Sequence, residues 1–297
     1  MNETVLLTGG TGFLGSHLVY ELLQNNYRVI LLKRSTSNTW RIDNVVNRVS
    51  CYDIDKTGLE AAFMDQHIDV VIHTACCYGR NNEPFSSIVA TNISFGIKIL
   101  ECALYNKAGV FINSDTIFDK YFSPYTLSKR QFTEWLSFSS ADIKVINMKL
   151  EHMYGPNDDN KKFVAWLLQQ LEGNVEEIKL TSGIQKRDFI YITDAVSAYL
   201  TAISSRFGLC QFTEFEIGTG NAVPVRVFVE EMERQYKACH PNCKSILNFG
   251  AISYRKNENM NVTANISMLE KLKWSPKVNY ITGIRKILDA GIITQEC

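Results

Sequence analysis

The glycine-rich stretch near the start of the chain constrains its fold more than any other feature. Thr4 to Leu7 is a short apolar run, typical of a buried strand, and TGGTGFLG follows from Thr8 to Gly15. From Phe13 onward, large apolar residues recur at helical spacing. Glycines in the turn let the backbone approach a pyrophosphate closely, and the helix N-terminus then offers free N–H groups to it. The order of strand, glycine turn and helix predicts dinucleotide binding. The cofactor-binding candidates here are Gly9, Thr11, Gly12, Phe13, Leu14 and Gly15.

The rest of the first half alternates between short apolar runs and helical patterns. Strands are expected at residues 28–33, 45–52, 69–73 and 110–113, and helices at 57–66, from Asn92 to about 106, and from Tyr125. This alternation predicts an α/β fold, a Rossmann-type doubly wound parallel sheet that binds ligands at the carboxyl ends of its strands. We expect residues 1–150, completed by about 187–218, to form the dinucleotide-binding domain. Residues 151–297 would form a smaller, interleaved substrate-binding domain, with helices at 163–171, 194–204, 225–236 and 268–272.

The end of the second expected strand bears on the choice of cofactor. In NAD-preferring folds an acidic residue usually stands there and hydrogen-bonds the ribose 2′-hydroxyl. Here Lys33 and Arg34 hold that place, followed by two hydroxyl residues. Cations and hydroxyls suit a 2′-phosphate, so we predict NADP(H); a solvated basic turn is the alternative. Asp53 ends the third expected strand near the adenine position, with Ile54 beside it.

Tyr125 and Lys129 carry the predicted chemistry. Residues at this spacing lie one turn apart on the same helix face. A lysine there lowers the pKa of the phenol and can hold the nicotinamide ribose, and the tyrosine can act as general acid or base. Thr116, at the end of the preceding strand, adds a polarising hydroxyl. Many helices contain a Tyr and a Lys at this spacing, but the place of this pair after a glycine-loop unit favours Thr116, Tyr125 and Lys129 as the catalytic set. The alternative is a strand-end hydroxyl beside an ordinary exposed pair.

Composition excludes several classes of partner. The 31 basic and 31 acidic residues give a net charge of zero without long runs of one sign. Nucleic acid or an anionic membrane is therefore not expected as the principal partner. The first residues lead directly into a core strand and no apolar run approaches membrane-spanning length, so we expect a cytoplasmic protein. Cys239, His240 and Cys243 lack a second ligand pair at zinc-site spacing, so no metal is expected.

These motifs resemble the extended short-chain dehydrogenase/reductase family, which includes nucleotide-sugar epimerases, dehydratases and reductases. Residues 149–156, KLEHMYGP, match the family's R-x-x-N-x-Y-G-P block, with Lys149 for arginine and His152 for asparagine. Residues 185–194, QKRDFIYITD, match its R-D-F block. The resemblance implies that Arg187 approaches the substrate diphosphate, that Arg255 adds a second such contact, and that the chain forms a homodimer. A core role for His152 and an ion pair between Arg187 and Asp188 remain open.

Longer segments are similar to the bacterial CDP-paratose and CDP-abequose synthases, a subgroup of that family. They are ACCYGRNNEP (75–84), KLEHMYGP (149–156) and KLTSGIQKRDFIYITD (179–194), with FGAISYRKNENM (249–260) in support. The resemblance implies an NADPH-dependent reduction of the 4-keto group of CDP-4-dehydro-3,6-dideoxy-D-glucose, in O-antigen dideoxysugar synthesis, and the loop at 75–84 favours the paratose branch. The substrate-binding candidates are Tyr78, Arg80, Glu83, Thr116, His152, Arg187 and Arg255, and the further cofactor candidates are Ala75 and Asn92. A solvated loop is an equal alternative for Arg80 and Glu83.

The sequence also departs from the family. Asp115 stands between Ser114 and Thr116, and residues 117–119, Ile-Phe-Asp, replace the usual Tyr-Gly. A dehydratase typically carries Asp-Glu directly after the strand-end threonine, so elimination is disfavoured. The alternatives are a dTDP-4-keto-6-deoxyhexose reductase, a nucleotide-sugar 4-epimerase and an NADP-sensing regulatory protein. Lys33 and Arg34 disfavour the epimerase, which regenerates its NAD in place, and the intact catalytic set disfavours the sensor.

Overall fold

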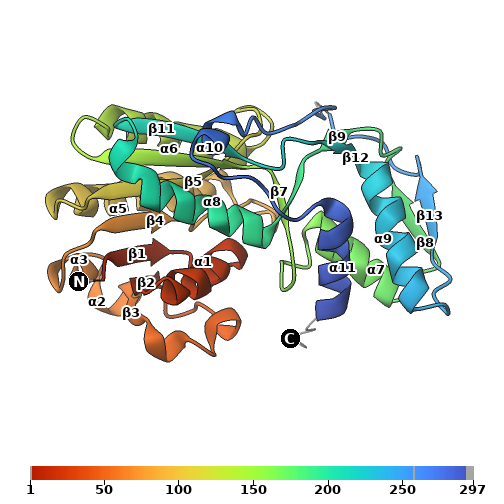
Figure 1. Cartoon of the computed structure of the whole chain (residues 1–297), viewed down its shortest axis with the longest axis horizontal. Helices are drawn as coiled ribbons and strands as arrows, with labels where there is room; N and C mark the ends of the chain where they lie inside the picture. Colours follow the sequence, from red (N-terminus) through yellow and green to blue (C-terminus); the bar gives the residue numbers. More distant parts are fainter. Residues whose placement is uncertain (1, 257, 292–297) are drawn as a thin grey trace. The chain divides into compact units, whose positions relative to one another are not determined.

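The computed structural model describes residues 2–256 and 258–291 of the 297-residue chain (Figure 1). The chain divides into two compact units. Unit 1 comprises the chain up to Leu150 together with Val196–Glu216, and unit 2 comprises Glu151–Ala195 and the chain from Ile217 onward.

Unit 1 is built on a seven-stranded sheet with the order β11-β6-β5-β4-β1-β2-β3. The strands are β1 (Thr4–Thr8), β2 (Arg28–Lys33), β3 (Ser50–Asp53), β4 (Val70–His73), β5 (Val110–Thr116), β6 (Lys144–Leu150) and β11 (Phe212–Ile217). Neighbouring strands from β3 to β6 pair in parallel. Every residue of β1, β4 and β5 is buried, as a sheet with both faces covered requires. The chain order reverses direction between β1 and β4, which is the switch point where such sheets bind ligands. The predicted α/β fold with a doubly wound parallel sheet is confirmed.

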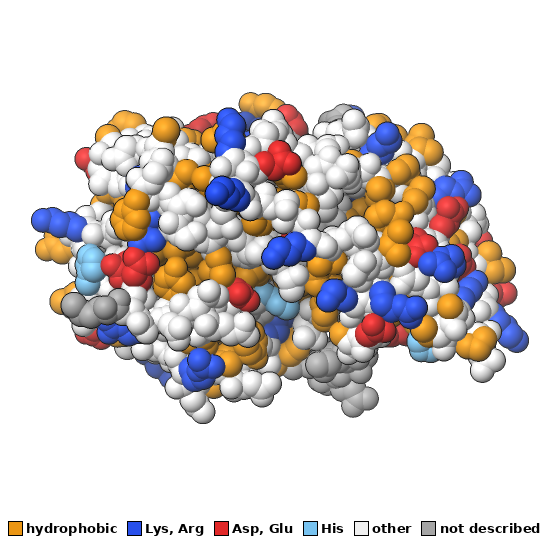
Figure 2. Space-filling view, in the orientation of Figure 1, with side chains coloured by type: hydrophobic (Ala, Val, Ile, Leu, Met, Phe, Trp, Pro, Cys, Tyr) orange, Lys and Arg blue, Asp and Glu red, His pale blue; other side chains and the backbone are white. Residues whose placement is uncertain are grey.

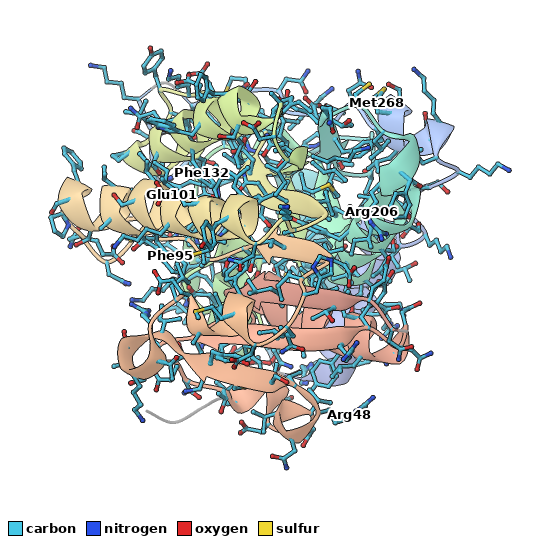
Figure 3. All side chains as sticks on the ribbon, turned by 90° about the vertical axis from the view of Figure 1, so that its left-hand side faces the viewer. Arg48, Phe95, Glu101, Phe132, Arg206 and Met268 are labelled. Carbon is cyan, nitrogen blue, oxygen red and sulfur yellow. The ribbon has the colours of Figure 1, made fainter. Side chains whose placement is uncertain are left out.

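Helices cover both faces of this sheet. They are α1 (Phe13–Gln24), α2 (Ile54–Thr57), α3 (Ala61–Met64), α4 (Phe85–Val89), the π-helical η3 (Ala90–Ser94), α5 (Phe95–Tyr105), α6 (Pro124–Ser139) and α8 (Ile192–Ser205). Phe132 of α6, labelled in Figure 3, packs edge-on against Phe111 of β5 with ring centroids 6.2 Å apart. A Cβ on Gly96 of α5 would lie 2.7 Å from that phenylalanine ring. The small residue therefore allows α5 and α6 to pack closely side by side.

Three predicted boundaries are wrong. The strand expected at 45–52 begins only at Ser50, because residues 46–48 form a 3₁₀ turn, η2 (Val46–Arg48). The helix expected at 57–66 is divided into α2 and α3 by Gly58, whose φ of +75° lies in the left-handed region. The helix expected to start at Asn92 begins earlier, at Phe85, directly after Pro84. Asn92 consequently lies buried inside the helix rather than at its start.

The earlier start of that helix corrects one expectation about membranes. Over Phe85–Tyr105 the continuous helix is long and apolar enough to cross a bilayer, by length and composition only. The prediction that no apolar run approaches this length is therefore wrong. A core helix passes the same test, so this is weak evidence for a membrane span. On the face shown in Figure 2, Lys and Arg side chains are interspersed with Asp and Glu.

Within its described residues, unit 2 contains short strand pairs and four helices. The helices are α7 (Phe163–Glu172), α9 (Val225–Cys239), α10 (Ser267–Lys271) and α11 (Tyr280–Ala290). The strand pairs are β7 (His152–Tyr154) with β10 (Phe189–Tyr191), β8 (Glu177–Leu180) with β13 (Ile246–Phe249), and β9 (Lys186–Arg187) with β12 (Val223–Pro224). Phe189 and Phe228 stack with centroids 3.9 Å apart, and Tyr154 meets both rings edge-on. This aromatic cluster forms the core of the unit.

Candidate active site

The turn after β1 is shaped to receive phosphate. Gly9 has a φ of +71°, and its carbonyl accepts a hydrogen bond of 2.9 Å from the Gly12 N–H. A Cβ on Gly15 would lie 2.1 Å from that same carbonyl oxygen. The first turn of α1 carries no acidic residue, and no side chain caps its N-terminus. The backbone N–H groups and the helix dipole are therefore available to an anion, and the glycine cradle fits a dinucleotide pyrophosphate.

In the structure, the carboxylate of Asp53 on β3 lies close to the basic end of β2. Lys33 Nζ lies 3.9 Å from Asp53 Oδ2, and the Ser35 hydroxyl donates to both oxygens of that carboxylate. The hydrogen bond from Ser35, with smaller contributions from the backbone N–H of Asp55 and from Lys33 and Lys56, lowers the pKa of Asp53. Arg34 is exposed. Of the predicted basic pair, Lys33 thus has an acidic neighbour, whereas Arg34 extends into solvent.

Arg41 is a cation near the glycine turn that sequence reasoning missed. It lies in a short 3₁₀ turn, η1 (Trp40–Ile42), and its guanidinium lies 4.4 Å from the centre of the Trp40 ring. Arg41 Nη1 donates to the Thr11 carbonyl at 3.4 Å. The buried Ile42 anchors this turn. Only tertiary packing brings this segment to the glycine turn, so no local sequence signal pointed to it.

The end of β4 borders the glycine turn. Ala75 N–H donates to the Thr8 hydroxyl at 3.3 Å, and a Cβ on Gly9 would lie 2.7 Å from the Ala75 nitrogen. His73 is fully buried, with Nδ1 2.9 Å from the same hydroxyl. Burial, aided by the positive charge of Lys129, lowers the pKa of His73 to about 3. The imidazole is therefore neutral at physiological pH, in keeping with a structural role.

Asn92 braces the loop that follows β4. Its side-chain oxygen accepts a hydrogen bond of 2.7 Å from the Cys77 N–H. Its amide nitrogen donates to the Cys77 carbonyl and, at 2.8 Å, to Ser128 Oγ on α6. Both ends of the amide are thus engaged by the protein, which ties this loop to α6.

The start of α6 positions Tyr125 and Lys129. Ser123 and Thr126 form a reciprocal capping box, and Pro124 occupies the first helical turn. Tyr125 therefore lies in the first turn, and Lys129, which is only 1% exposed, follows one turn later. Burial lowers the pKa of Lys129, while the negative charge of Asp115 opposes that change.

The expected lowering of the Tyr125 pKa is wrong. Burial raises this pKa well above its ordinary value, and Tyr78, Cys76 and Asp115 add to the rise. The ring centroids of Tyr78 and Tyr125 are 4.8 Å apart. The guanidinium of Arg80 lies over the Tyr78 ring, 4.7 Å from its centroid. The loop after β4 thus shields the phenol, which is protonated at neutral pH.

Two hydroxyls and one acid occupy the end of β5. Ser114 Oγ lies 2.6 Å from the Tyr199 hydroxyl on α8, and Thr116 Oγ1 accepts from the Phe118 N–H at 3.4 Å. Side chains alternate between the faces of a strand, so Ser114 and Thr116 share one face and Asp115 points to the other. Ser114 is a second candidate for the polarising hydroxyl, and the S-x-T spacing is the signal that could have indicated it.

Two further substrate candidates, Glu83 and His152, are engaged with protein groups. Glu83 accepts hydrogen bonds from the backbone and side chain of Asn81, at 2.7 and 3.2 Å. In unit 2, His152 Nδ1 is hydrogen-bonded to Glu151, and its ring meets Phe189 edge-on.

Arg187 and Asp188 each bond to other groups of unit 2. Arg187 is 4% exposed and pairs with Glu258, and it donates to the carbonyl of Asn259. Asp188 accepts from the N–H groups of Thr219, Gly220 and Ala264. Arg255 is exposed. Arg187 thus ties a strand of unit 2 to the segment that follows Arg255.

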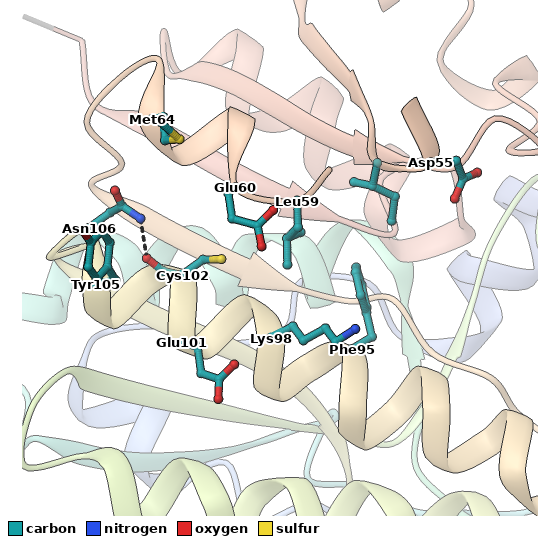
Figure 4. Close-up of a pocket in the computed structure, with 11 residues that line it drawn as sticks. Asp55, Leu59, Glu60, Met64, Phe95, Lys98, Glu101, Cys102, Tyr105 and Asn106 are labelled. Atoms are coloured by element: carbon teal, nitrogen blue, oxygen red, sulfur yellow. Dashed lines mark hydrogen bonds between the residues drawn. The ribbon is translucent and has the colours of Figure 1, made fainter. Parts of the chain in front are cut away.

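The lining of the cavity in Figure 4 does not include the candidate catalytic side chains Thr116, Tyr125 and Lys129. The cavity measures about 680 Å³ and is lined by α5 and the segment from Ile54 to Met64. Of the candidate residues, only Ile54 contributes to its wall. Residues 2–256 and 258–291 contain no cluster of three or more His, Cys, Asp or Glu side chains able to hold a metal ion.

Comparison with known proteins places the chain in a family. Residues 5–218 match the model of the NAD dependent epimerase/dehydratase family. The CDP-abequose synthase of Salmonella typhimurium is 32% identical, over 97% of this chain and 98% of that protein. The solved UDP-glucuronic acid 4-epimerase of Bacillus cereus, in complex with UDP-glucuronic acid and NAD, superimposes with a TM-score of 0.81 at 23% identity, over 97% of this chain and 98% of that one. The UDP-glucose 4-epimerase of Thermotoga maritima gives a TM-score of 0.80 at 22% identity, with the same coverage of both chains. The resemblance predicted from the sequence is confirmed, and the chain belongs to the NAD dependent epimerase/dehydratase family of nucleotide-sugar-modifying, Rossmann-fold enzymes.

Proposed function

We propose that the protein is an NADPH-dependent 4-keto reductase of a nucleotide-linked deoxysugar. The substrate that best fits the sequence is CDP-4-dehydro-3,6-dideoxy-D-glucose, reduced to CDP-paratose or CDP-abequose. The observation that carries this proposal is the place of Tyr125 in the first turn of α6, against the Tyr78 ring and one turn before the buried Lys129. The full-length similarity to CDP-abequose synthase supports the sugar class.

The reduction needs one hydride and one proton. NADPH, when bound, supplies the hydride to C4 of the sugar. Tyr125 donates its phenolic proton to the oxygen as negative charge develops there, and the solvent later restores that proton. A hydroxyl of β5, from Thr116 or Ser114, donates a hydrogen bond to the same oxygen. Lys129 holds the nicotinamide ribose through its ammonium.

The other candidate residues are proposed to bind the cofactor and the substrate and to hold them in position. The glycine cradle from Gly9 to Gly15 receives the pyrophosphate of the cofactor. Lys33 and Arg34 are proposed to bind the 2′-phosphate, where exposed Arg34 has the freer cation. Arg187 and Arg255 are proposed to bind the substrate diphosphate, which positions the sugar for hydride transfer.

Apolar side chains exposed on α4, α5 and α6 support a homodimer. Phe85, Tyr105 and Phe138 are 72%, 88% and 82% exposed. These neighbouring helices are where we propose that the two copies meet, because exposed apolar side chains lose contact with water at such an interface. Sedimentation analysis of the purified protein tests this proposal, and a monomer at micromolar concentration contradicts it.

The decisive experiment follows NADPH oxidation with two sugars and two proteins. Wild type and Tyr125→Phe are assayed with CDP-4-keto-3,6-dideoxyglucose and with dTDP-4-keto-6-deoxyglucose. We expect oxidation with the CDP sugar, a loss of at least about 100-fold in Tyr125→Phe, and unchanged NADPH binding in that variant. NMR of the product then assigns the configuration at C4. Tight NADPH binding without oxidation of either sugar contradicts the reductase and favours a sensor.

A further inference from the structure

Glu151 is a buried acid at the start of unit 2. Its side chain is fully shielded from solvent, and its Oε2 lies 2.5 Å from Nδ1 of the adjacent His152. Its other carboxylate oxygen, Oε1, is buried and has no hydrogen-bond partner among the residues that the structure describes. Burying such a group is costly, so its retention in the fold calls for an explanation. The imidazole of His152 is the group on which this acid can act.

The backbone and a neighbouring ring hold the two residues in place. The Glu151 N–H donates to the Ile217 carbonyl at 3.0 Å, and the Glu151 carbonyl accepts from the Met153 N–H at 2.8 Å. His152 begins β7 and lies opposite Phe189 of β10 in a parallel pair. The two rings meet edge-on, with their centroids 5.7 Å apart. The imidazole is therefore held by the acid at Nδ1 and by the aromatic ring beside it.

The hydrogen bond to Glu151 determines which ring nitrogen of His152 carries a proton. An ionised carboxylate can only accept, so the hydrogen lies on Nδ1 and is donated to the acid. Nε2 is on the edge of the ring away from the acid. The His152 side chain is 31% exposed although its partner is wholly buried, so the ring connects a buried acid to the solvent-exposed surface. His73, by contrast, is fully buried.

Arg187 belongs to the same part of unit 2 as this ring. It precedes Phe189 by two residues, which places their Cα atoms within about 7 Å of each other. Phe189 is the register partner of His152, and paired strands lie about 5 Å apart. The Cα atoms of Arg187 and His152 are therefore within about 12 Å of each other. Over that span, a guanidinium and an imidazole can bind the same diphosphate.

We propose that Glu151 is a positioning residue that holds the His152 imidazole against the diphosphate of the nucleotide-sugar substrate. His152 donates from Nδ1 to Glu151 and from Nε2 to a phosphoryl oxygen, so the ring carries both protons in the complex. The buried carboxylate balances that positive charge. Glu151 acts through the histidine and touches neither substrate nor cofactor. The inference rests on the proposed function for the identity of the substrate, whereas the diphosphate contact is testable without any sugar.

NMR of the full chain with nitrogen-labelled histidine shows which ring nitrogens carry protons. In the free protein we expect a proton on Nδ1 of His152. In the protein saturated with CDP we expect protons on both nitrogens and a shifted Nε2 signal. His152→Asn identifies the signals, because they disappear in that variant. A CDP-bound ring that lacks either proton, or an Nε2 signal that CDP does not move, overturns the inference.

Calorimetric titration with CDP and with dTDP measures the contribution of the acid. Glu151→Gln keeps the size of the side chain and removes its charge, and Glu176→Gln, at an exposed position of the same unit, is the matched control. We expect both dissociation constants to rise about tenfold in Glu151→Gln. NADPH binding should stay unchanged, and the control should behave as wild type does. In the sugar assay, the KM should rise by a similar factor while kcat stays nearly constant, because the contact is the same before and during the reaction.

A double-mutant cycle shows whether the acid acts through the histidine. Glu151→Gln should weaken CDP binding no further once His152→Asn is present, and additive losses overturn the inference. The NMR measurement on the wild-type chain remains decisive if Glu151→Gln folds poorly. CDP binding that depends on both residues, without turnover of either sugar, leaves the inference standing and rejects the reductase. Sugar reduction with an unchanged KM in a folded Glu151→Gln overturns the inference and leaves the reductase standing.

Discussion

Gly15→Ala is the substitution for which the structure gives the sharpest expectation. A methyl group there would lie 2.1 Å from the Gly9 carbonyl oxygen and 2.7 Å from the Gly10 Cα, and all of these atoms belong to backbone. Ordinary contact requires more than 3.4 Å, so the turn must withdraw from α1 by about 1 Å. That displacement disturbs the Gly12 N–H bond to the Gly9 carbonyl, which closes the phosphate cradle.

Two opposing effects set the stability of Gly15→Ala. Overpacking costs about 1–3 kcal/mol, and replacing glycine by alanine within a helix recovers roughly 1 kcal/mol. The net loss is therefore about 0–2 kcal/mol, a fall of at most a few degrees in melting temperature. Nucleotide binding should suffer more, because the cradle itself moves. We expect the NADPH dissociation constant to rise by about 100-fold, or roughly 2.8 kcal/mol.

Fluorescence titration with NADPH, alongside thermal unfolding, measures both quantities. Gly208→Ala is the matched control, because a Cβ there has no atom within 4 Å and the backbone is not left-handed. The control should bind NADPH as wild type does. If Gly15→Ala binds NADPH within threefold of wild type, the assignment of this turn as the pyrophosphate cradle is refuted.

Three further expectations concern the cofactor, the fold of unit 2 and acid stability. Replacing Lys33 and Arg34 together by alanine should weaken NADPH binding by about tenfold and leave NADH binding unchanged; equal losses for both nucleotides contradict the 2′-phosphate assignment. Asp188→Asn should lose about 2–3 kcal/mol of unfolding free energy, because its amide would face backbone N–H donors. Asp142→Asn on the exposed surface is its control in urea unfolding. His73 has a pKa of about 3 when folded against an ordinary 6.5, so the folded state binds fewer protons between these values. Its contribution to stability is complete above pH 6.5 and is lost on acidification toward pH 3, at up to about 1.4 kcal/mol per pH unit. Urea titrations of His73→Gln should lack this slope, and identical slopes in the two proteins would reject the assignment.

The local sequence pattern correctly predicted the parts of unit 1 whose structure is determined by residues adjacent in the sequence. Strands β1 and β4 are continuous apolar runs, and each is buried along its whole length. The glycine turn was predicted as well, because its spacing is a property of a few consecutive residues. The predicted helix boundaries were wrong where a single glycine or proline overrides the helical pattern of apolar residues. Gly58 interrupts an otherwise helical stretch, and Pro84 starts a helix earlier than its amphipathic pattern indicates.

The electrostatics of the candidate site could not be read from residue spacing. The spacing of Tyr125 and Lys129 suggested a lowered pKa for the phenol, as proximity to a cation would produce. In the structure, the loop after β4 places Tyr78 against Tyr125, and burial then dominates. This burial depends on a contact between residues 78 and 125, which are far apart in the sequence. The spacing of residues along one helix cannot predict such a contact. Arg41 was missed for the same reason.

The acid at position 115 shows how strand geometry changes the meaning of a sequence motif. In the sequence, Asp115 between Ser114 and Thr116 is a departure from the family pattern without an assigned role. On β5, however, alternate side chains point to opposite faces, so Ser114 meets Tyr199 of α8 while Asp115 meets Thr133 of α6. The carboxylate accepts hydrogen bonds from fixed donors and is almost wholly buried, which makes it a poor proton shuttle to a sugar. An acid that stays beneath the helix adds no second proton donor to the site. Tyr125 is then the proposed proton donor. A reduction needs one such group, whereas an elimination requires an additional acid or base.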